Sequence, residues 1–148
     1  MSFTLQTASF SNIDDMVANC SMKSDKARHT IAIGGKNTVK DISFIIDWCT
    51  VKTLPDQYDK LWVTIPPDAE RAITKLMTSV FPDAEPVIKN HAIGIKVTPV
   101  QQKPVIMEFK LGEMVKVQMK FDAAYTVKGK LYIVLKFESM EKIELDLM

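Results

Sequence analysis

Lysines and tyrosines recur through the segment between Gly112 and Ile143, where apolar residues alternate with polar ones. A period of two gives a β-strand one apolar and one polar face. Cations on such a face can contact phosphates, and aromatic rings can stack on nucleobases. The polar face is therefore a candidate surface for binding nucleic acid, and its members are Lys116, Lys120, Tyr125, Lys128, Lys130, Tyr132 and Lys136.

The same segment predicts a β-hairpin. Apolar residues alternate over 115–121 and again over 131–137, and a turn signal lies between them at 126–130. Gly129 can adopt a positive φ without steric cost, which suits a tight turn. The two polar faces are expected to lie side by side on the outer surface of this hairpin.

Three aromatic residues elsewhere could also serve as stacking platforms. Trp62 is out of phase with the apolar positions of 61–65, so we expect it to be exposed, and we add it to the candidate site. Tyr58 is a further candidate. Trp48 is in phase with the apolar positions of 42–46, which predicts that it belongs to the core.

Length and composition limit the choices. The chain has 148 residues, of which 47% are hydrophobic and 25% charged, as expected for a single globular domain over residues 1–148. Its net charge of +1 means that affinity for a polyanion must come from local clustering of charge. The two cysteines are isolated, which predicts free thiols and an intracellular setting in the cytoplasm of a host cell. The lack of a secretory or long apolar segment predicts no membrane association.

Two helices and several strands are predicted around the hairpin. A helix is expected from Asp68, as N-cap, to Pro82, with an apolar stripe over 69–80, and a shorter one is expected after Ser11. The polar run 22–29 is interpreted as a solvated loop, with a phosphate-contacting loop as the alternative. Strands are expected in the segments 30–33, 42–48, 61–65, 88–97 and 105–109, and the end of the chain, with Leu145 and Leu147, as a last strand or a tail.

This order of elements predicts a mainly β fold, an OB-fold-like antiparallel barrel with one helix between the third and fourth strands. Other small β-barrels and α+β sandwiches remain alternatives.

Catalytic and metal-binding patterns are lacking. Neither His29 nor His91 has a second ligand at metal-binding spacing, and the pair Asp14-Asp15 fits the start of a helix. The chain has no nucleophile-elbow or deaminase signature. We therefore expect a binding protein without a cofactor, not an enzyme.

A longer pattern in the C-terminal third carries a resemblance. Gly112 precedes a Val-rich strand, Tyr125 lies near the turn, Lys128-Gly129-Lys130 follows, and the return strand ends in Ser139-Met140-Glu141. This segment, about a fifth of the chain, resembles the C-terminal hairpin of tailed-phage single-stranded DNA-binding proteins of the OB fold. The resemblance implies coating of single strands in replication and recombination. Members of that family often end in an acidic, aromatic tail that recruits replication proteins, whereas this chain ends in the mildly acidic, non-aromatic Glu144-Leu145-Asp146-Leu147-Met148.

The resulting hypothesis is a protein that binds single-stranded DNA without sequence preference. RNA is not excluded as a ligand, because recognition of a 2′-hydroxyl needs only one or two polar groups. The sequence also leaves open the oligomeric state and the partners among replication or recombination proteins. The alternative is a viral interaction or inhibitor module that docks through a sheet edge.

Overall fold

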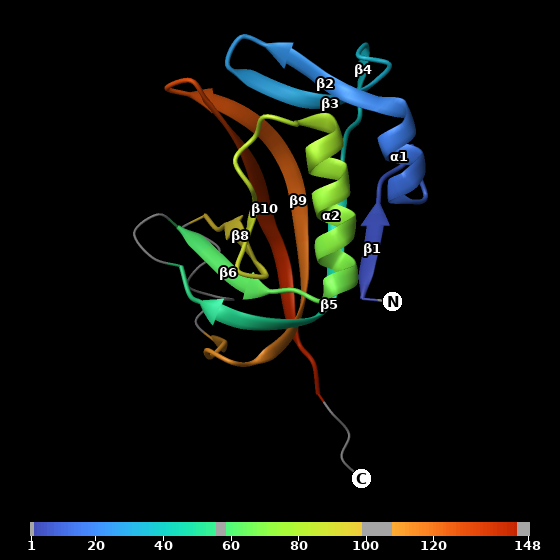
Figure 1. The fold of residues 1–148 in the computed structure, drawn as a ribbon. Helices are drawn as coiled ribbons and strands as arrows, with labels where there is room; N and C mark the ends of the chain where they lie inside the picture. The colour runs from blue at the N-terminus through green and yellow to red at the C-terminus, as the bar shows by residue number, and fades with distance from the viewer. Residues whose placement is uncertain (1, 56–58, 99–107, 145–148) are drawn as a thin grey trace.

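The computed structural model describes residues 2–55, 59–98 and 108–144. These residues form a mainly β structure with two helices (Figure 1). In chain order the elements are β1 (Phe3–Gln6), α1 (Ile13–Asn19), β2 (Cys20–Asp25), β3 (Arg28–Ile33), β4 (Asn37–Thr38), β5 (Ser43–Thr53), β6 (Lys60–Thr64), α2 (Pro67–Val80), β7 (Ile88–Lys89), β8 (Ala92–Lys96), β9 (Met114–Val127) and β10 (Lys130–Lys142).

Five of the strands form a hydrogen-bonded ring. Its order is β5, β6, β8, β10 and β9, and β9 pairs back onto β5. Each pair is antiparallel except β8 with β10, which is parallel. β1 extends the sheet beside β5. β3 pairs with β9 near the C-terminal end of β9, and β2 and β4 both pair with β3. Each ring strand therefore has a hydrogen-bonded neighbour on both sides.

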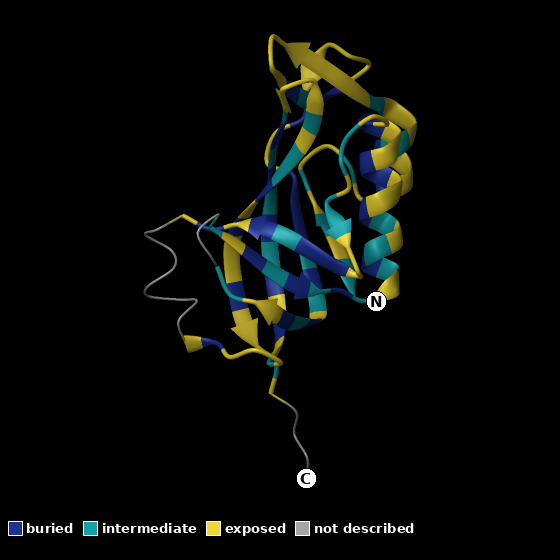
Figure 2. Ribbon diagram, turned by 60° about the vertical axis from the view of Figure 1, so that its left-hand side comes forward, coloured by how far each residue is buried: buried dark blue, intermediate teal, exposed yellow. Residues whose placement is uncertain are grey.

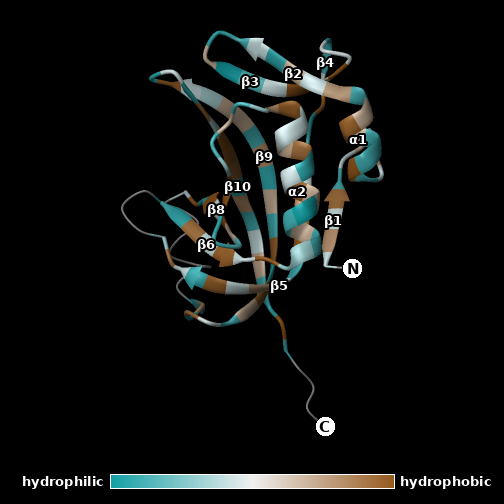
Figure 3. Cartoon of the chain, in the orientation of Figure 1, coloured by the Kyte–Doolittle hydropathy of each residue, from teal (hydrophilic) through white to brown (hydrophobic). Residues whose placement is uncertain are grey.

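The apolar faces of the ring strands and one face of α2 form the core. Phe44 on β5, Ile93 on β8 and Met119 on β9 have no exposed surface (Figure 2). Figure 3 shows hydrophilic and hydrophobic residues alternating along β9, which agrees with the predicted period of two. The predicted helical stripe is also confirmed, because the residues buried on α2 are Ala69, Ile73, Leu76, Met77 and Val80.

The prediction that Trp48 belongs to the core is wrong. A β-bulge between Ile46 and Cys49 shifts the register of β5 against β9. Trp48 lies in this bulge with a φ of +61°, and 49% of its surface is exposed. The bulge reverses the alternation that had placed Trp48 inside, since an extra residue changes which side chains face the core.

Both predicted helix caps are displaced by one or two residues. Asn12, and not Ser11, caps α1, since its side chain accepts a hydrogen bond of 2.8 Å from the backbone N–H of Asp15. Pro66 is the N-cap residue of α2, without a side-chain hydrogen bond. Asp68 lies in the first turn, where it accepts a hydrogen bond of 2.9 Å from the backbone N–H of Ser2.

The polar run 22–29 is not a loop, as the first interpretation had it. It forms most of the β2–β3 hairpin, which pairs from Cys20 with Ile33 to Asp25 with Arg28. Lys26, with a φ of +58°, lies in its turn. The alternation that marks a strand is weak in β2 because almost all of its residues are exposed.

The remaining expectations concern the number of elements. The mainly β class is confirmed, and the described residues contain both expected helices. However, α2 follows the sixth strand in chain order and not the third, because β1, β2 and β4 were not counted as strands. Phe109 is buried outside any strand. Tyr58, Val105, Met107, Leu145 and Leu147 lie outside the described residues.

Replacement of a core ring should be costly. Phe44 is fully buried and lies 5.7 Å, centroid to centroid, from the ring of Phe3. We expect Phe44→Ala to lower the free energy of unfolding by about 3–5 kcal/mol. Met22→Ala, at a position that is 39% exposed, should change it by less than about 0.5 kcal/mol. Urea denaturation measures both, and equal effects would contradict the assignment of the core.

Stability should fall at alkaline pH because of Cys49. Burial, with a smaller contribution from the charge of Asp47, raises the pKa of the Cys49 thiol to about 12. The thiol pKa is about 8.5 in an unfolded chain, so above this pH the unfolded state loses a proton that the folded state keeps. The free energy of unfolding should therefore fall with rising pH, by up to about 1.4 kcal/mol per pH unit, and be unaffected by this group below about pH 8.

Cys49→Ala removes the titrating group. Its stability should therefore depend less steeply on pH than that of the native chain when urea denaturation is compared at about pH 8 and about pH 10. Parallel profiles would show that the thiol does not contribute.

Candidate nucleic-acid interface

The predicted C-terminal hairpin is present, with a two-residue turn. Lys128 and Gly129 have φ values of +51° and +80°, the pattern of a type I′ turn. Across the hairpin, Tyr125 pairs directly with Tyr132, and Lys120 pairs with Lys136. The structure therefore brings these four predicted residues together in two cross-strand pairs.

The pairing of the lysines continues across the ring. Lys136 of β10 is the partner of Lys96 of β8, and Lys96 is the partner of Lys60 of β6. Four adjacent strands thus place a lysine at the same level, in the order Lys60, Lys96, Lys136 and Lys120, which we call the lysine row. With strands about 4.8 Å apart, the row spans about 14 Å.

The lysine row is unfavourable for the isolated fold. Like charges directly opposite each other on a sheet destabilise it. Lysines often protect a sheet edge from aggregation, but each strand of the row lies within the ring and has no free edge. Protection of a sheet edge therefore does not account for the lysine row.

Carboxylates neutralise one end of the lysine row. Lys120 lies 3.1 Å from Asp41, and Lys136 lies 3.4 Å from Asp122. The hydrogen bond from Lys120 to Asp41, with the charge of Asp41, raises the pKa of Lys120. In the described part of the chain, no carboxylate lies within ion-pair distance of Lys60 or Lys96. The positive charge that is open to a ligand therefore lies toward β6 and β8.

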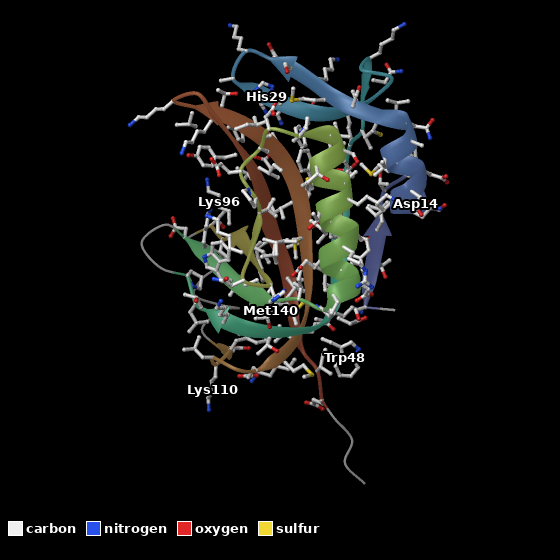
Figure 4. The ribbon with its side chains drawn as sticks, in the orientation of Figure 1. Asp14, His29, Trp48, Lys96, Lys110 and Met140 are labelled. Atoms are coloured by element: carbon white, nitrogen blue, oxygen red, sulfur yellow. The ribbon has the colours of Figure 1, made fainter. Side chains whose placement is uncertain are left out.

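A groove opens on that side, between β6, β8 and β10 and the segment that leads into β7. Its volume is about 590 Å³. Four lysines line it with one carboxylate, that of Glu85, and Figure 4 shows Lys96 on this side of the ring. The lining residues are Lys60, Trp62, Glu85, Pro86, Val87, Lys89, Gly94, Lys96, Lys130, Tyr132, Ile133, Val134 and Leu135.

In this groove the indole of Trp62 packs against Gly94, which has no side chain. Gly94 is the cross-strand partner of Trp62, and a Cβ at position 94 would lie 2.9 Å from two atoms of the indole. The Nζ of Lys60 lies 5.8 Å from the centroid of the indole, a cation–π distance. Trp62 therefore rests against the sheet beside a cation, and it is half-buried, not exposed as expected from the sequence.

The other predicted residues have different surroundings. Lys130 lines the groove and lies 3.8 Å from Glu85, and the hydroxyl of Tyr125 donates a hydrogen bond of 3.0 Å to Asp122. Lys128 is exposed at the tip of the turn. Lys116 is opposite Glu141 in the register of β9 and β10, near the end of the hairpin that is distant from the groove.

Three groove residues, Lys60, Lys89 and Lys96, were missed in the sequence. A signal for two of them exists, because Lys60 is two residues before Trp62, and Lys96 is on the polar side of the strand that contains Ile95. The sequence does not reveal which strands are neighbours, so it could not predict the lysine row. Lys89 is the last residue of β7 and lines the groove. It precedes the tight β7–β8 turn, where Asn90 and His91 both have a positive φ.

Among the described residues, no three His, Cys, Asp or Glu side chains come together in a way that could hold a metal ion. Neither described helix has the length and apolar character needed to cross a membrane. No protein-family model, curated protein or solved structure matches the chain.

The contact between Trp62 and Gly94 can be tested with a double-mutant cycle. Gly94→Ala should lower the free energy of unfolding by about 1–3 kcal/mol, because the new methyl group overlaps the indole. In a Trp62→Ala background the same substitution should cost almost nothing. Urea denaturation of the four proteins measures the coupling, and an equal cost in both backgrounds would show that the indole does not rest on Gly94.

Proposed function

We propose that this protein binds single-stranded nucleic acid, with DNA as the preferred ligand, without sequence preference. The observation that carries the proposal is the lysine row next to a groove that contains Trp62 and Tyr132. The lysines contact successive phosphates, and the two rings stack on bases.

We further propose that the ring is an OB-like barrel. An OB fold has five strands, and it binds oligonucleotides on the face of its second and third strands, between the first and last of its loops. In the chain order of the ring the second and third strands are β6 and β8, which carry Lys60, Trp62 and Lys96. The turn at Lys128 joins the fourth and fifth strands, so in an OB-like barrel the candidate groove would lie on the face that this fold uses for oligonucleotides, which supports the proposal.

A single strand suits this groove better than a duplex. Rings can stack only on bases that are not already stacked within a helix, and the groove presents rings and cations together. Each base stacked on a ring contributes about 1–3 kcal/mol, whichever base it is. The resemblance of the C-terminal hairpin adds the role of coating strands exposed in replication or recombination.

One observation favours the alternative of a protein-interaction module. β2 ends the sheet, and its outer edge pairs with no other described strand. A partner strand could extend the sheet there. Such a partner would leave the groove unused, which separates the two functions experimentally.

A titration with labelled oligo-dT, oligo-rU and duplex DNA at two salt concentrations tests the proposal. We expect oligo-dT to quench the protein's tryptophan fluorescence, and its affinity to fall steeply with salt. The duplex should bind more weakly. Unchanged fluorescence and no binding at low salt with all three ligands would favour the interaction module.

Substitutions in the groove should weaken binding and leave the fold intact. Tyr132→Ala removes one stacked base, so the affinity for oligo-dT should fall by about 1–3 kcal/mol. Lys96→Gln should lower the slope of log affinity against log salt by about 0.7, the value for one phosphate contact with a single strand. Lys120→Glu should weaken binding less than Lys96→Glu, because Asp41 already pairs with Lys120.

Lys110 provides the matched control, since Figure 4 places it at the end of the molecule opposite His29 and away from Lys96. Lys110→Gln should leave both the affinity and the salt slope unchanged. If it has the same effect as Lys96→Gln, only net charge matters and the groove is not the site.

A further inference from the structure

The β2–β3 hairpin and β4 concentrate the positive charge of the chain. Residues 20–40, which we call the basic arm, contain five cations and one carboxylate, that of Asp25. With His29 neutral their net charge is +4, whereas the whole chain has a net charge of +1, so the remaining residues carry −3. The cations of the basic arm are Lys23, Lys26, Arg28, Lys36 and Lys40.

These five side chains are open to solvent. Each is exposed, and the arm projects at the top of the molecule (Figures 1 and 2). Among the described residues, none of the five forms an ion pair. Lys120 and Lys136, by contrast, have carboxylate partners. The positive charge of the basic arm is therefore not neutralised by ion pairs among the described residues.

A buried histidine fixes the turn end of the β2–β3 hairpin to the C-terminal hairpin. His29 is only 8% exposed, and its Nδ1 lies 2.7 Å from the Oγ of Ser24 on β2. Its Nε2 lies 2.7 Å from the Oγ1 of Thr126 on β9. The backbone N–H of Thr126 also donates to the carbonyl of Ala27 at 2.8 Å. These contacts hold the arm in one position against β9.

That position makes the arm continuous with the lysine row. Arg28 is the cross-strand partner of Tyr125, which is itself the partner of Tyr132 in the groove. A second groove of about 500 Å³ lies between the arm and the hairpin, and Arg28 and Lys40 line one side while Lys120 and Lys136 line the other. The carboxylates of Asp41 and Asp122 also line it, so it links the two basic surfaces but is less positive than either.

We infer that the basic arm is a second phosphate-binding surface, which contacts the part of a long single strand that leaves the groove. The inference rests on the proposed function. The inference goes beyond the proposed function because it predicts two separable sets of contacts. Short oligonucleotides make one set in the groove, and only longer strands reach the other set on the arm.

The test uses a double charge reversal on the arm, Arg28→Glu with Lys40→Glu, in the full-length protein. Oligo-dT of about 5 and of about 20 nucleotides bracket the 4–16 nucleotides that one OB fold covers. For the long strand we expect the slope of log affinity against log salt to fall by about 1.4, since two phosphate contacts are lost. For the short strand the slope and the affinity should match those of the native protein.

Lys52→Glu with Lys110→Glu is the matched control, because it changes the net charge by the same amount on exposed residues outside the arm and both grooves. Circular dichroism checks that each variant is folded, and Arg28→Gln with Lys40→Gln replaces the double reversal if that variant is not.

The outcomes are distinct. An arm variant that matches the control on the long strand, or that weakens both strands equally, overturns the inference while the proposed function stands. Failure of the native protein to bind either oligonucleotide overturns both. Binding of the arm to anionic lipid vesicles or to an acidic protein, with no effect of the arm variant on the long strand, would assign the surface to another partner.

Discussion

The pairing of β9 with β5 is the constraint on which the rest of the structure depends. β9 is long enough to pair with β5 along its lower half and with β3 near its upper end, so one strand both closes the ring and supports the basic arm. Closure encloses the apolar faces of five strands in one core and directs their polar faces outward. The lysine row and the groove follow from this closure, because they combine residues from strands that are distant in sequence.

The two ends of the lysine row on the outward face differ in their electrostatic environment. Repulsion within the lysine row is reduced at one end by Asp41 and Asp122 and left in place at the other, where Lys60 and Lys96 have no carboxylate partner among the described residues. A phosphate would offset the repulsion at that end, so ligand binding and relief of electrostatic strain would coincide. The indole of Trp62 rests against Gly94, so it would offer a preorganised surface to a ligand and reduce the entropy lost on binding.

Local patterns in the sequence predicted the helices and strands correctly where one face of the element is buried. The alternation in β9 and β10 and the apolar stripe of α2 are as predicted. Trp62 is off the core face of β6, as its phase predicted, but it is half-buried and not exposed. The predictions failed where a pattern is interrupted or absent. The bulge at Trp48 reverses the alternation of β5, and β2 has too few buried residues to show any alternation. The register between distant strands depends on closure of the ring and cannot be seen in local patterns. Trp62 and Tyr132 were therefore predicted as site residues, but their neighbour Lys96 was not.

The seam between β8 and β10 has a consequence for the evolution of this molecule. The two strands are in register at Lys96 and Lys136, and beyond that point residues 84–85 take the place beside β10, with Glu85 donating a backbone hydrogen bond of 2.8 Å to Leu131. Glu85, Pro86 and Val87 of the connection between α2 and β7 therefore form part of the groove wall, together with β6, β8 and β10. Insertions or deletions in that connection could broaden or narrow the range of ligands that fit, while the hydrogen-bonded sheet and its core stayed the same.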